Sequence, residues 1–494
     1  MRVRELLLDI EPLRASRDFR AIFVARVVSL FGLGMATVAL SSQVYDLTES
    51  TFQVAAVSMI MSVSVLLGSL WGGWMADRAD RRRLIITARA VAAVAFAGLA
   101  ANAFTDDPGL AAIYACVAVD GLATGVSVTA LMAVAPTLVR PDQLPAAGAL
   151  IAFTGEIGSI GAPFLGGVLL AATGPGPVFA LTAATTGVTT LLLLRLRPLP
   201  PVPAEDDDEG AGEGDGSGGR GEGKDDGSPL VAFRFARRNP VVGSLLALGG
   251  VTVLFNLPVV LFPELVATRF GGSDVVLGLL YSAPAVGAVL ISATSGWITR
   301  ATRPGRLLLT AAFTGGLATV GFGLSGEIWI AVLALAVGGA AGTVYEILEY
   351  ALVQHNTPDH LRGRMVGVLS AQGTTGDVLG DVEVALIARW FNPAGAAVVN
   401  GAVCAVAAAL VAVLVPGLRH ATLPRDDEDE DDDAHQAGGP DERSGPGTPA
   451  PATAAAAPSA AATAAAAAKS GPSAGQDTAC PGTGPERDAP AATA

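Results

Sequence analysis

The stretch GGWMADRADRRRLIITA, residues 72–88, decides the fold because the chain contains a second copy of it. That copy, SGWITRATRPGRLLLTA, occupies residues 295–311 and aligns without a gap at an offset of 223 residues. Each copy carries a glycine and a tryptophan, then an arginine-rich turn, then the start of an apolar run. The pair predicts that the chain is an internal duplication.

Two further segments repeat at nearly the same distance. Residues 141–144 (PDQL) correspond to residues 358–361 (PDHL) at an offset of 217. Residues 154–156 (TGE) correspond to residues 375–377 (TGD) at an offset of 221. Because the offset stays nearly constant over three segments, we expect two units in parallel orientation, as in transporters built from repeats about an axis along the membrane normal.

Long apolar stretches separate the repeated turns. The chain has 494 residues, of which 51% are hydrophobic and 15% charged, whereas soluble domains average about 25% charged residues. A membrane-spanning helix needs about 20 mainly apolar residues. Twelve stretches qualify: residues 21–44, 52–75, 84–104, 110–134, 146–172, 177–195, 242–265, 274–299, 307–325, 328–352, 366–388 and 395–416. The sequence therefore predicts an all-α membrane protein with twelve transmembrane helices in two six-helix, pseudo-symmetric halves.

Arginines lie on alternate joints between these stretches. One set of joints carries Arg78, Arg81, Arg82, Arg83, Arg140, Arg195, Arg197, Arg234, Arg237, Arg238, Arg300, Arg303, Arg306, Arg362 and Arg364. The alternate set contains only Arg269 and Arg389. Since arginine-rich joints stay in the cytoplasm, we expect a bacterial inner-membrane protein with both termini cytoplasmic.

Composition divides the rest of the chain. The linker between the halves, residues 199–229, is rich in glycine, proline and acids and cannot bury a core. The tail, residues 419–494, is acidic and then Ala/Pro-rich. We expect both segments to be disordered. The segment LVAFRFARRNP mixes phenylalanines with arginines, which favours an interfacial helix on anionic headgroups. The expected order is a cytoplasmic leader 1–20, a helix bundle 21–198, the linker 199–229, the interfacial helix 230–240, a second bundle 241–418 and the tail 419–494.

The turn at residues 73–82, with the pattern G-x-x-x-D-R-x-x-R-R, resembles the signature loop of the major facilitator superfamily. It departs from that family at Asp80, where glycine is common. Residues 44–50 (VYDLTES), 237–240 (RRNP) and 358–364 (PDHLRGR) resemble its enterobactin-exporter-like and macrolide-efflux-like branch.

The resemblance implies a conformational latch made by Gly73, Asp77, Arg78, Arg81 and Arg82. The glycine would let two helices approach, Asp77 would sit against the N-terminus of the eleventh helix, and the arginines would pair with carboxylates and headgroups. In the second half, Arg300 takes the place of Asp77, so the matching latch is degenerate. The alternative is a basic loop that only sets topology.

Acids inside the predicted spans need an explanation, because a charge costs about 2.5–3.5 kcal/mol at the centre of a span. Asp120, Glu156 and Asp377 lie near the middle of their stretches, and Asp381 follows Asp377 on the same helical face. These four are candidates for proton coupling or substrate binding; the alternative is a structural contact between helices. Glu383 lies nearer the outer end, where we expect water to solvate it.

Other polar residues lie near the ends of the spans. Glu346 and Glu349 are near the expected cytoplasmic mouth and are possible gate residues. Arg26 and Arg89 lie a few residues inside their helices, and we expect their side chains to extend to the interface. Residues 256–258 (NLP) predict a kink in the seventh helix.

The sequence contains no enzymatic pattern. It has no P-loop, which argues against ATP-driven export, and its three cysteines and four histidines show no metal-ligand or disulfide spacing. We expect no enzyme, cofactor, metal site or nucleic-acid partner, and a monomer that works in the lipid bilayer.

The favoured function is export of small amphipathic molecules, drugs or siderophore-like metabolites, by proton antiport with alternating access. A proton-coupled uptake symporter of the same fold is the first alternative. The second is a non-transporting sensor or scaffold that signals through its acidic tail.

Overall fold

The computed structural model describes residues 13, 17–76, 78, 80–134, 144–194, 230–255, 257–298 and 301–421. The leader up to residue 12, the linker 199–229 and the tail from residue 422 therefore lie outside the described residues, as does Asp77. The helices are α2 (Arg17–Thr48), α3 (Thr51–Ala76), α4 (Arg81–Ala103), α5 (Leu110–Val134), α6 (Leu144–Thr173), α7 (Pro175–Leu193), α8 (Leu230–Arg238), α9 (Pro240–Leu254), α10 (Phe262–Arg269), α11 (Asp274–Thr294), α12 (Pro304–Leu324), α13 (Ile328–His355), α14 (Asp359–Leu414) and α15 (Pro416–Arg419).

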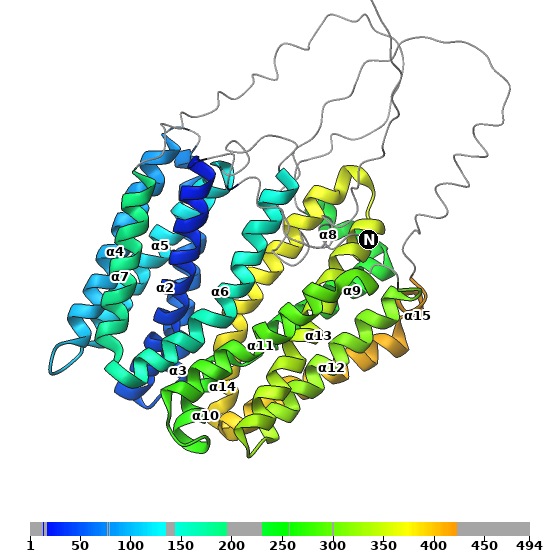
Figure 1. Ribbon diagram of the computed structural model, residues 1–494. Helices are drawn as coiled ribbons and strands as arrows, with labels where there is room; N and C mark the ends of the chain where they lie inside the picture. The colour runs from blue at the N-terminus through cyan, green and yellow to red at the C-terminus, as the bar shows by residue number, and fades with distance from the viewer. Residues whose placement is uncertain are drawn as a thin grey trace, which may run out of the picture.

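The helices form two bundles that lie side by side. Helices α2–α7 make the N-terminal half, blue to cyan in Figure 1, and α9–α14 make the C-terminal half, green to orange. The halves meet mainly where α6 packs on α11 and α3 packs on α14. This arrangement agrees with the predicted all-α fold of two six-helix halves.

Ten of the described helices or helix pairs are long and apolar enough to cross a membrane. One of these, Leu361–Leu414, contains two passes, because Asn392 breaks α14 with φ 59° and ψ 166°. Helix α6 adds another pass: its apolar part Ile157–Thr173 is shorter, but the whole helix has 30 residues. Together these account for the twelve predicted spans.

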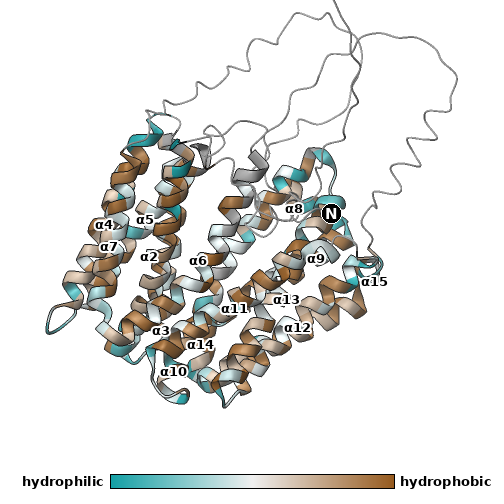
Figure 2. Cartoon of the chain, in the orientation of Figure 1, coloured by the Kyte–Doolittle hydropathy of each residue, from teal (hydrophilic) through white to brown (hydrophobic). Residues whose placement is uncertain are grey.

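Hydropathy along the bundles matches this reading. Hydrophobic colour covers the helix shafts in Figure 2, and hydrophilic colour gathers at their ends and turns. Large apolar side chains are exposed on the shafts, among them Leu70, Leu290 and Leu333. In water such surface would be unfavourable, so its natural solvent is lipid.

The seventh pass is not a single helix. Helix α9 ends at Leu254, a short 3-10 turn covers Val259–Leu261, and α10 begins at Phe262. The predicted kink is therefore a complete break. Proline at position 258 cannot donate a backbone hydrogen bond, which favours such an interruption.

Helix α8 is short and strongly amphipathic. Ala232 and Ala236 are buried against the C-terminal half, whereas Phe233 is exposed and Arg237 and Arg238 lie in the last turn. An apolar face beside a basic end suits a helix lying in the headgroup region.

The two ends of the molecule differ in how their cores are joined. We call the end where α4, α12 and α14 begin the arginine end, and the end where α5, α11 and α13 begin the far end. At the far end one continuous apolar core includes Val38, Phe179, Leu261, Phe262 and Leu280, from both halves. At the arginine end each half has a core of its own.

Candidate functional site

Polar contacts join the two halves at the far end. The Ser42 hydroxyl donates to Asp274 Oδ1 at 3.0 Å and lies 3.5 Å from Asp46 Oδ2. Nearby, the Thr51 hydroxyl donates to Glu264 of α10. These bonds run from α2 and α3 to the opposite half, so they hold the far end closed.

A glycine crossing brings the halves closest together. Gly167 of α6 faces Gly278 of α11, and a Cβ added at Gly167 would lie 2.8 Å from Gly278 Cα. Since real Cβ atoms do not approach that closely, no larger residue fits without moving a helix. A guanidinium–ring contact adds to the closure, with Arg389 5.5 Å from the centre of the Phe52 ring.

At the arginine end, the described contacts of Arg78 and Arg82, two of the predicted latch residues, lie within the N-terminal half. Arg78 stacks on Trp74 at 4.5 Å and donates to its carbonyl oxygen, and Arg82 donates to the carbonyl oxygen of Leu194 after α7. Arg81 begins α4. Asp77, the residue expected to contact the eleventh helix, lies outside the described residues.

Gly73 makes no close helix contact with the described residues in this conformation, so its role in the latch stays a prediction. A Cβ at Gly73 would meet Thr129 at an ordinary 3.8 Å, whereas one at Gly72 would lie 2.7 Å from Val126 Cα. Gly68 and Gly125 also lie against the backbone of the opposing helix. The tight α3–α5 packing therefore depends on these neighbouring glycines.

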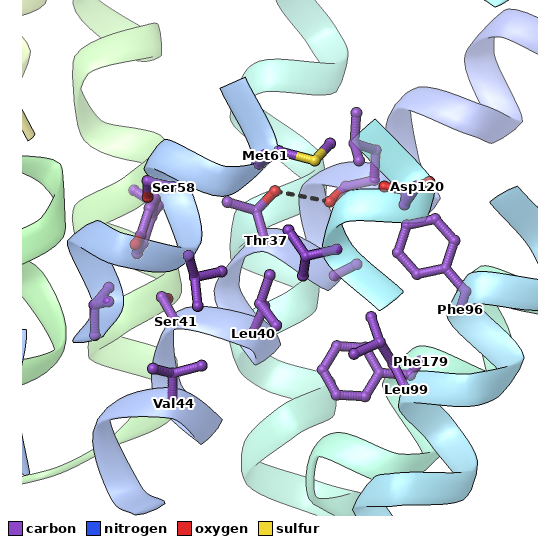
Figure 3. Close-up of a pocket in the computed structure, with 16 residues that line it drawn as sticks. Thr37, Leu40, Ser41, Val44, Ser58, Met61, Phe96, Leu99, Asp120 and Phe179 are labelled. Atoms are coloured by element: carbon purple, nitrogen blue, oxygen red, sulfur yellow. Dashed lines mark hydrogen bonds between the residues drawn. The ribbon is translucent and has the colours of Figure 1, made fainter. Parts of the chain in front are cut away.

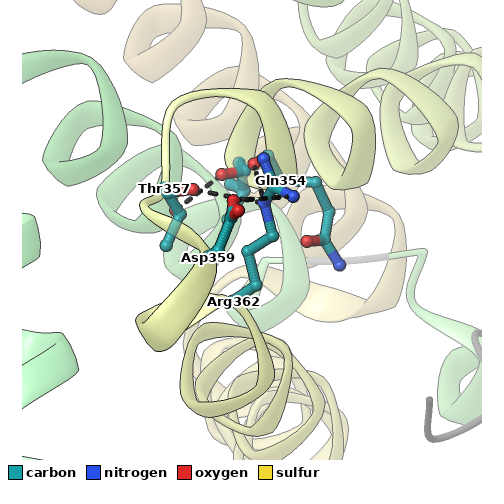
Figure 4. A network of polar contacts seen from close by, with 5 residues as sticks. Gln354, Thr357, Asp359 and Arg362 are labelled. Carbon is teal, nitrogen blue, oxygen red and sulfur yellow. Dashed lines mark hydrogen bonds and ion pairs between the residues drawn. The ribbon is translucent and has the colours of Figure 1, made fainter. Parts of the chain in front are cut away.

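The start of α14 is tied to the end of α13. Arg362 pairs with Asp359 at 2.9 Å, and its Nε donates to the carbonyl oxygens of Gln354 and Thr357 (Figure 4). The carbonyl groups at the end of a helix lack partners within it, and Arg362 supplies donors for them. This network also stays within one half.

A pocket of about 120 Å³ lies inside the N-terminal half. Its walls come from α2, α3, α4, α5 and α7, with Tyr281 of α11 as the contribution from the other half. Most of the lining is apolar, including Leu40, Met61, Phe96 and Phe179, as Figure 3 shows. Its lining suits the apolar body of a small ligand.

One carboxyl group lines this pocket. Asp120 is only 4% exposed, and its Oδ1 has no hydrogen-bond partner among the described residues. The Thr37 hydroxyl points at its carboxyl group, and a dashed line joins the two side chains in Figure 3. Because an unpaired buried carboxyl oxygen is costly, Asp120 is available to a ligand that brings a hydrogen-bond donor or a positive charge.

Arg89 lies inside the same bundle, and the prediction that it extends to the interface is wrong. Its Nη1 donates to Ser29 at 2.7 Å and its Nε donates to Ser127 at 3.1 Å. The N-terminal half thus holds a buried cation as well as a buried acid. Sequence reasoning missed this site, although serines on α2 and α5 near the depth of Arg89 were the available signal.

The structure describes the surroundings of the other predicted acids only in part. Glu156 lies on α6 and Asp377 on α14, but their side chains are outside the described residues. Asp381 is half-buried near Tyr281, which also lines the pocket. Of the four candidates, Asp120 is the one with a described pocket around it.

The two possible gate residues lie in different surroundings. Glu346 is exposed. Glu349 instead points into the C-terminal half: it accepts a hydrogen bond from Tyr345 at 3.0 Å, and its carboxyl group and the Gln372 amide lie against Gly249 of α9. Glu349 is therefore built into the packing of one half.

Comparisons with known proteins agree with this architecture. The family model described as Major Facilitator Superfamily matches residues 22–380 and, in a second match, residues 254–468. The enterobactin exporter EntS of Salmonella typhi is 34% identical over 396 residues, covering 80% of this chain and 91% of the exporter. EntS of Citrobacter koseri is 34% identical over 418 residues, covering 85% of this chain and 96% of its own.

Solved structures show the same fold at low identity. A POT family transporter in complex with 5-aminolevulinic acid superposes with a TM-score of 0.64 at 11% identity, covering 82% of this chain and 97% of that one. The nucleoside transporter NupG gives 0.62 at 14% identity, covering 81% and 99%.

Proposed function

Because the chain belongs to the major facilitator superfamily, we propose that it exports small amphipathic molecules, siderophore-like metabolites among them, by alternating access. It is a multi-pass membrane protein that transports small molecules, and no part of the proposal requires an enzymatic step. Relatives that are named enterobactin exporters align over nine-tenths or more of their own length, which supports the export direction over uptake.

The pocket around Asp120 is the observation that carries this proposal. It offers apolar walls to the body of an amphipathic molecule and an unpaired carboxyl oxygen to a hydroxyl, an amide or an amine. A scaffold that only signals would have no need of such a pocket, and leaving a buried carboxyl oxygen without a partner would destabilise it.

The orientation completes the proposal. With the arginine end in the cytoplasm of a bacterial cell, the far end faces outward. The shared core and the Ser42–Asp274 bond close the outward side, so this conformation receives substrate from the cytoplasm. The proposal includes cytoplasmic termini, the inner membrane and a monomer.

The driving force in this proposal is proton antiport. Export against a gradient needs an energy source, and the sequence has no P-loop. Asp120, Glu156, Asp377 and Asp381 remain candidates for exchanging a proton with substrate, and buried acids of this kind serve as proton relays in transporters. The turn at residues 73–82 is proposed to stabilise the outward-open state.

Direction can be tested with oriented vesicles. Purified protein in inside-out vesicles with an acidic lumen should accumulate a catecholate siderophore or an amphipathic dye inside. An uptake symporter would instead concentrate substrate in right-side-out vesicles with acid outside. A chain without residues 421–494 should keep its flux; loss of the cellular phenotype with flux unchanged would favour the scaffold alternative.

The pocket can be tested by Asp120→Asn. We expect initial export to fall about tenfold or more, because a contact worth roughly 1.4 kcal/mol is a factor of ten in binding. The matched control is Asp106→Asn, an acid exposed in the turn between α4 and α5, which should export normally. Normal export by Asp120→Asn, with normal substrate affinity, would remove Asp120 from the site.

A further inference from the structure

A second buried acid lies in the C-terminal half, away from the pocket. Glu383 is on α14, nine residues before the break at Asn392, and Asn400 follows that break on the twelfth pass. The Asn400 side chain lies beside the Glu383 carboxyl group. The sequence position of Glu383 predicted hydration at the outer end, but both of its carboxyl oxygens are buried.

Three oxygen atoms of this pair lack hydrogen-bond partners. Glu383 Oε1, Glu383 Oε2 and Asn400 Oδ1 are all buried, and none has a hydrogen-bond partner among the described residues. All three are acceptors, and Asn400 is only 1% exposed. Buried polar atoms are normally paired. The Asn400 amide NH2 lies beside the Glu383 carboxyl group, but Asn400 Oδ1 has no donor among the described residues.

Cys404, which lies near Glu383, and two arginines near the same end of this half make contacts elsewhere. The Cys404 thiol donates to the Phe255 carbonyl oxygen at 3.1 Å, at the end of α9. Arg389 lies over the Phe52 ring, and Arg269 of α10 donates to the carbonyl oxygens that end α12. Asp381, the other acid at this level of α14, can add only negative charge when ionised.

We propose that Glu383 and Asn400 form a proton-binding site in the C-terminal half and that Glu383 is protonated in this conformation. The carboxylate takes one proton from water, and the resulting O–H donates to Asn400 Oδ1. One proton thereby supplies the missing donor, satisfies the amide oxygen and removes a charge from a buried position, where a lone charge is costly.

Protonation of Glu383 can affect how α14 packs against the end of α9 in the C-terminal half. Gly380, one turn before Glu383, packs against the Leu254 carbonyl oxygen at the end of α9, and Cys404 bonds to Phe255 in the break of the seventh pass. Opening the far end would hydrate Glu383 and expose it to outside protons. The structure then corresponds to a proton-loaded state that precedes substrate binding from the cytoplasm.

This inference rests on the proposed proton-coupled export but can be tested without substrate. The full chain in liposomes is treated with dicyclohexylcarbodiimide, which enters membranes and reacts with protonated carboxyl groups, and adducts are located by mass spectrometry. We expect an adduct at Glu383 that increases severalfold as the pH falls from about 8 to about 5, because only the protonated acid reacts with the carbodiimide. Glu327, exposed at the start of α13, is the internal control and should stay unlabelled.

Glu383→Gln provides the second measurement. Glutamine keeps an N–H donor for Asn400 and imitates the neutral acid, so the variant should fold and exchange substrate across the membrane. Export driven by a pH gradient should fall about tenfold, as expected when one ionisable group carries the coupling. Glu327→Gln should behave as the unsubstituted chain.

The outcomes separate the two proposals. An unlabelled Glu383 across the whole pH range would overturn the protonated site even if export is proton-driven. Labelling with no loss of gradient-driven export in Glu383→Gln would overturn its role in coupling. Failure of the unsubstituted chain to export anything would contradict the proposed function, whereas the labelling would still report on Glu383.

Discussion

The far end and the arginine end of this molecule are built on the same twelve helices but are joined differently. At the far end, one apolar core and hydrogen bonds from Ser42 and Thr51 cross between the halves. At the arginine end, each half has its own core, and Arg82 and Arg362 bond within their own halves. Contacts at the far end must break in each transport cycle, whereas those described at the arginine end can persist.

The largest effect on export is expected where the backbones of α6 and α11 are in contact. Gly167→Leu places a branched side chain against Gly278, so the far end cannot close as observed. We expect gradient-driven export to fall by more than about tenfold, since overpacking costs roughly 1–3 kcal/mol and here opposes one conformation. Spin labels attached at Asp107→Cys and Glu327→Cys, both exposed at the far end, should report a longer separation.

The matched control for this substitution is Gly155→Leu. Gly155 is on the same helix, and a Cβ there meets nothing within 4 Å. This variant should export normally and keep the spin-label distance. Equal losses in both variants would mean that α6 tolerates no leucine, and the close crossing would not explain the effect.

A smaller change should follow from removing one hydrogen bond between the halves. Ser42→Ala deletes the donor to Asp274 Oδ1, and a net hydrogen bond is worth about 1 kcal/mol. The ratio of far-end-closed to far-end-open molecules should fall about fivefold, as measured by the same labels. Ser282→Ala, whose hydroxyl donates to the Gly278 carbonyl oxygen within α11, should leave the ratio unchanged.

The smallest effect is expected at the arginine end. Arg362→Ala removes a largely exposed ion pair and two bonds to the end of α13. Exposed pairs contribute about 0–1 kcal/mol, so thermal unfolding should shift by a few degrees at most. The spin-label distance at the far end should not move; a change there would show that the two ends are coupled through this turn.

The sequence was sufficient for the architecture. Repeated turns at a nearly constant offset and the alternation of arginines predicted two parallel halves and the position of each joint. These features are readable because a bilayer imposes helix length and charge placement on the chain itself. The proline at position 258 likewise marked the seventh pass, although the break proved complete.

The surroundings of individual side chains could not be predicted in the same way. Depth along a helix does not say which way a side chain points, so Arg89 and Glu383 were expected near water and are enclosed. Glu349 was expected at a mouth and packs against Gly249. Asp120 was selected correctly as a buried acid, but its pocket depends on helices far apart in the sequence.

The turn at Asn392 has a mechanical consequence. Asn392 alone separates the two passes of α14, and its side chain caps the second pass by accepting a hydrogen bond from the Gly395 N–H at 2.9 Å. Because the connection is so short, the two passes cannot tilt independently of each other. Any tilt of the eleventh pass during the cycle therefore moves the twelfth pass with it at the outward end of the C-terminal half.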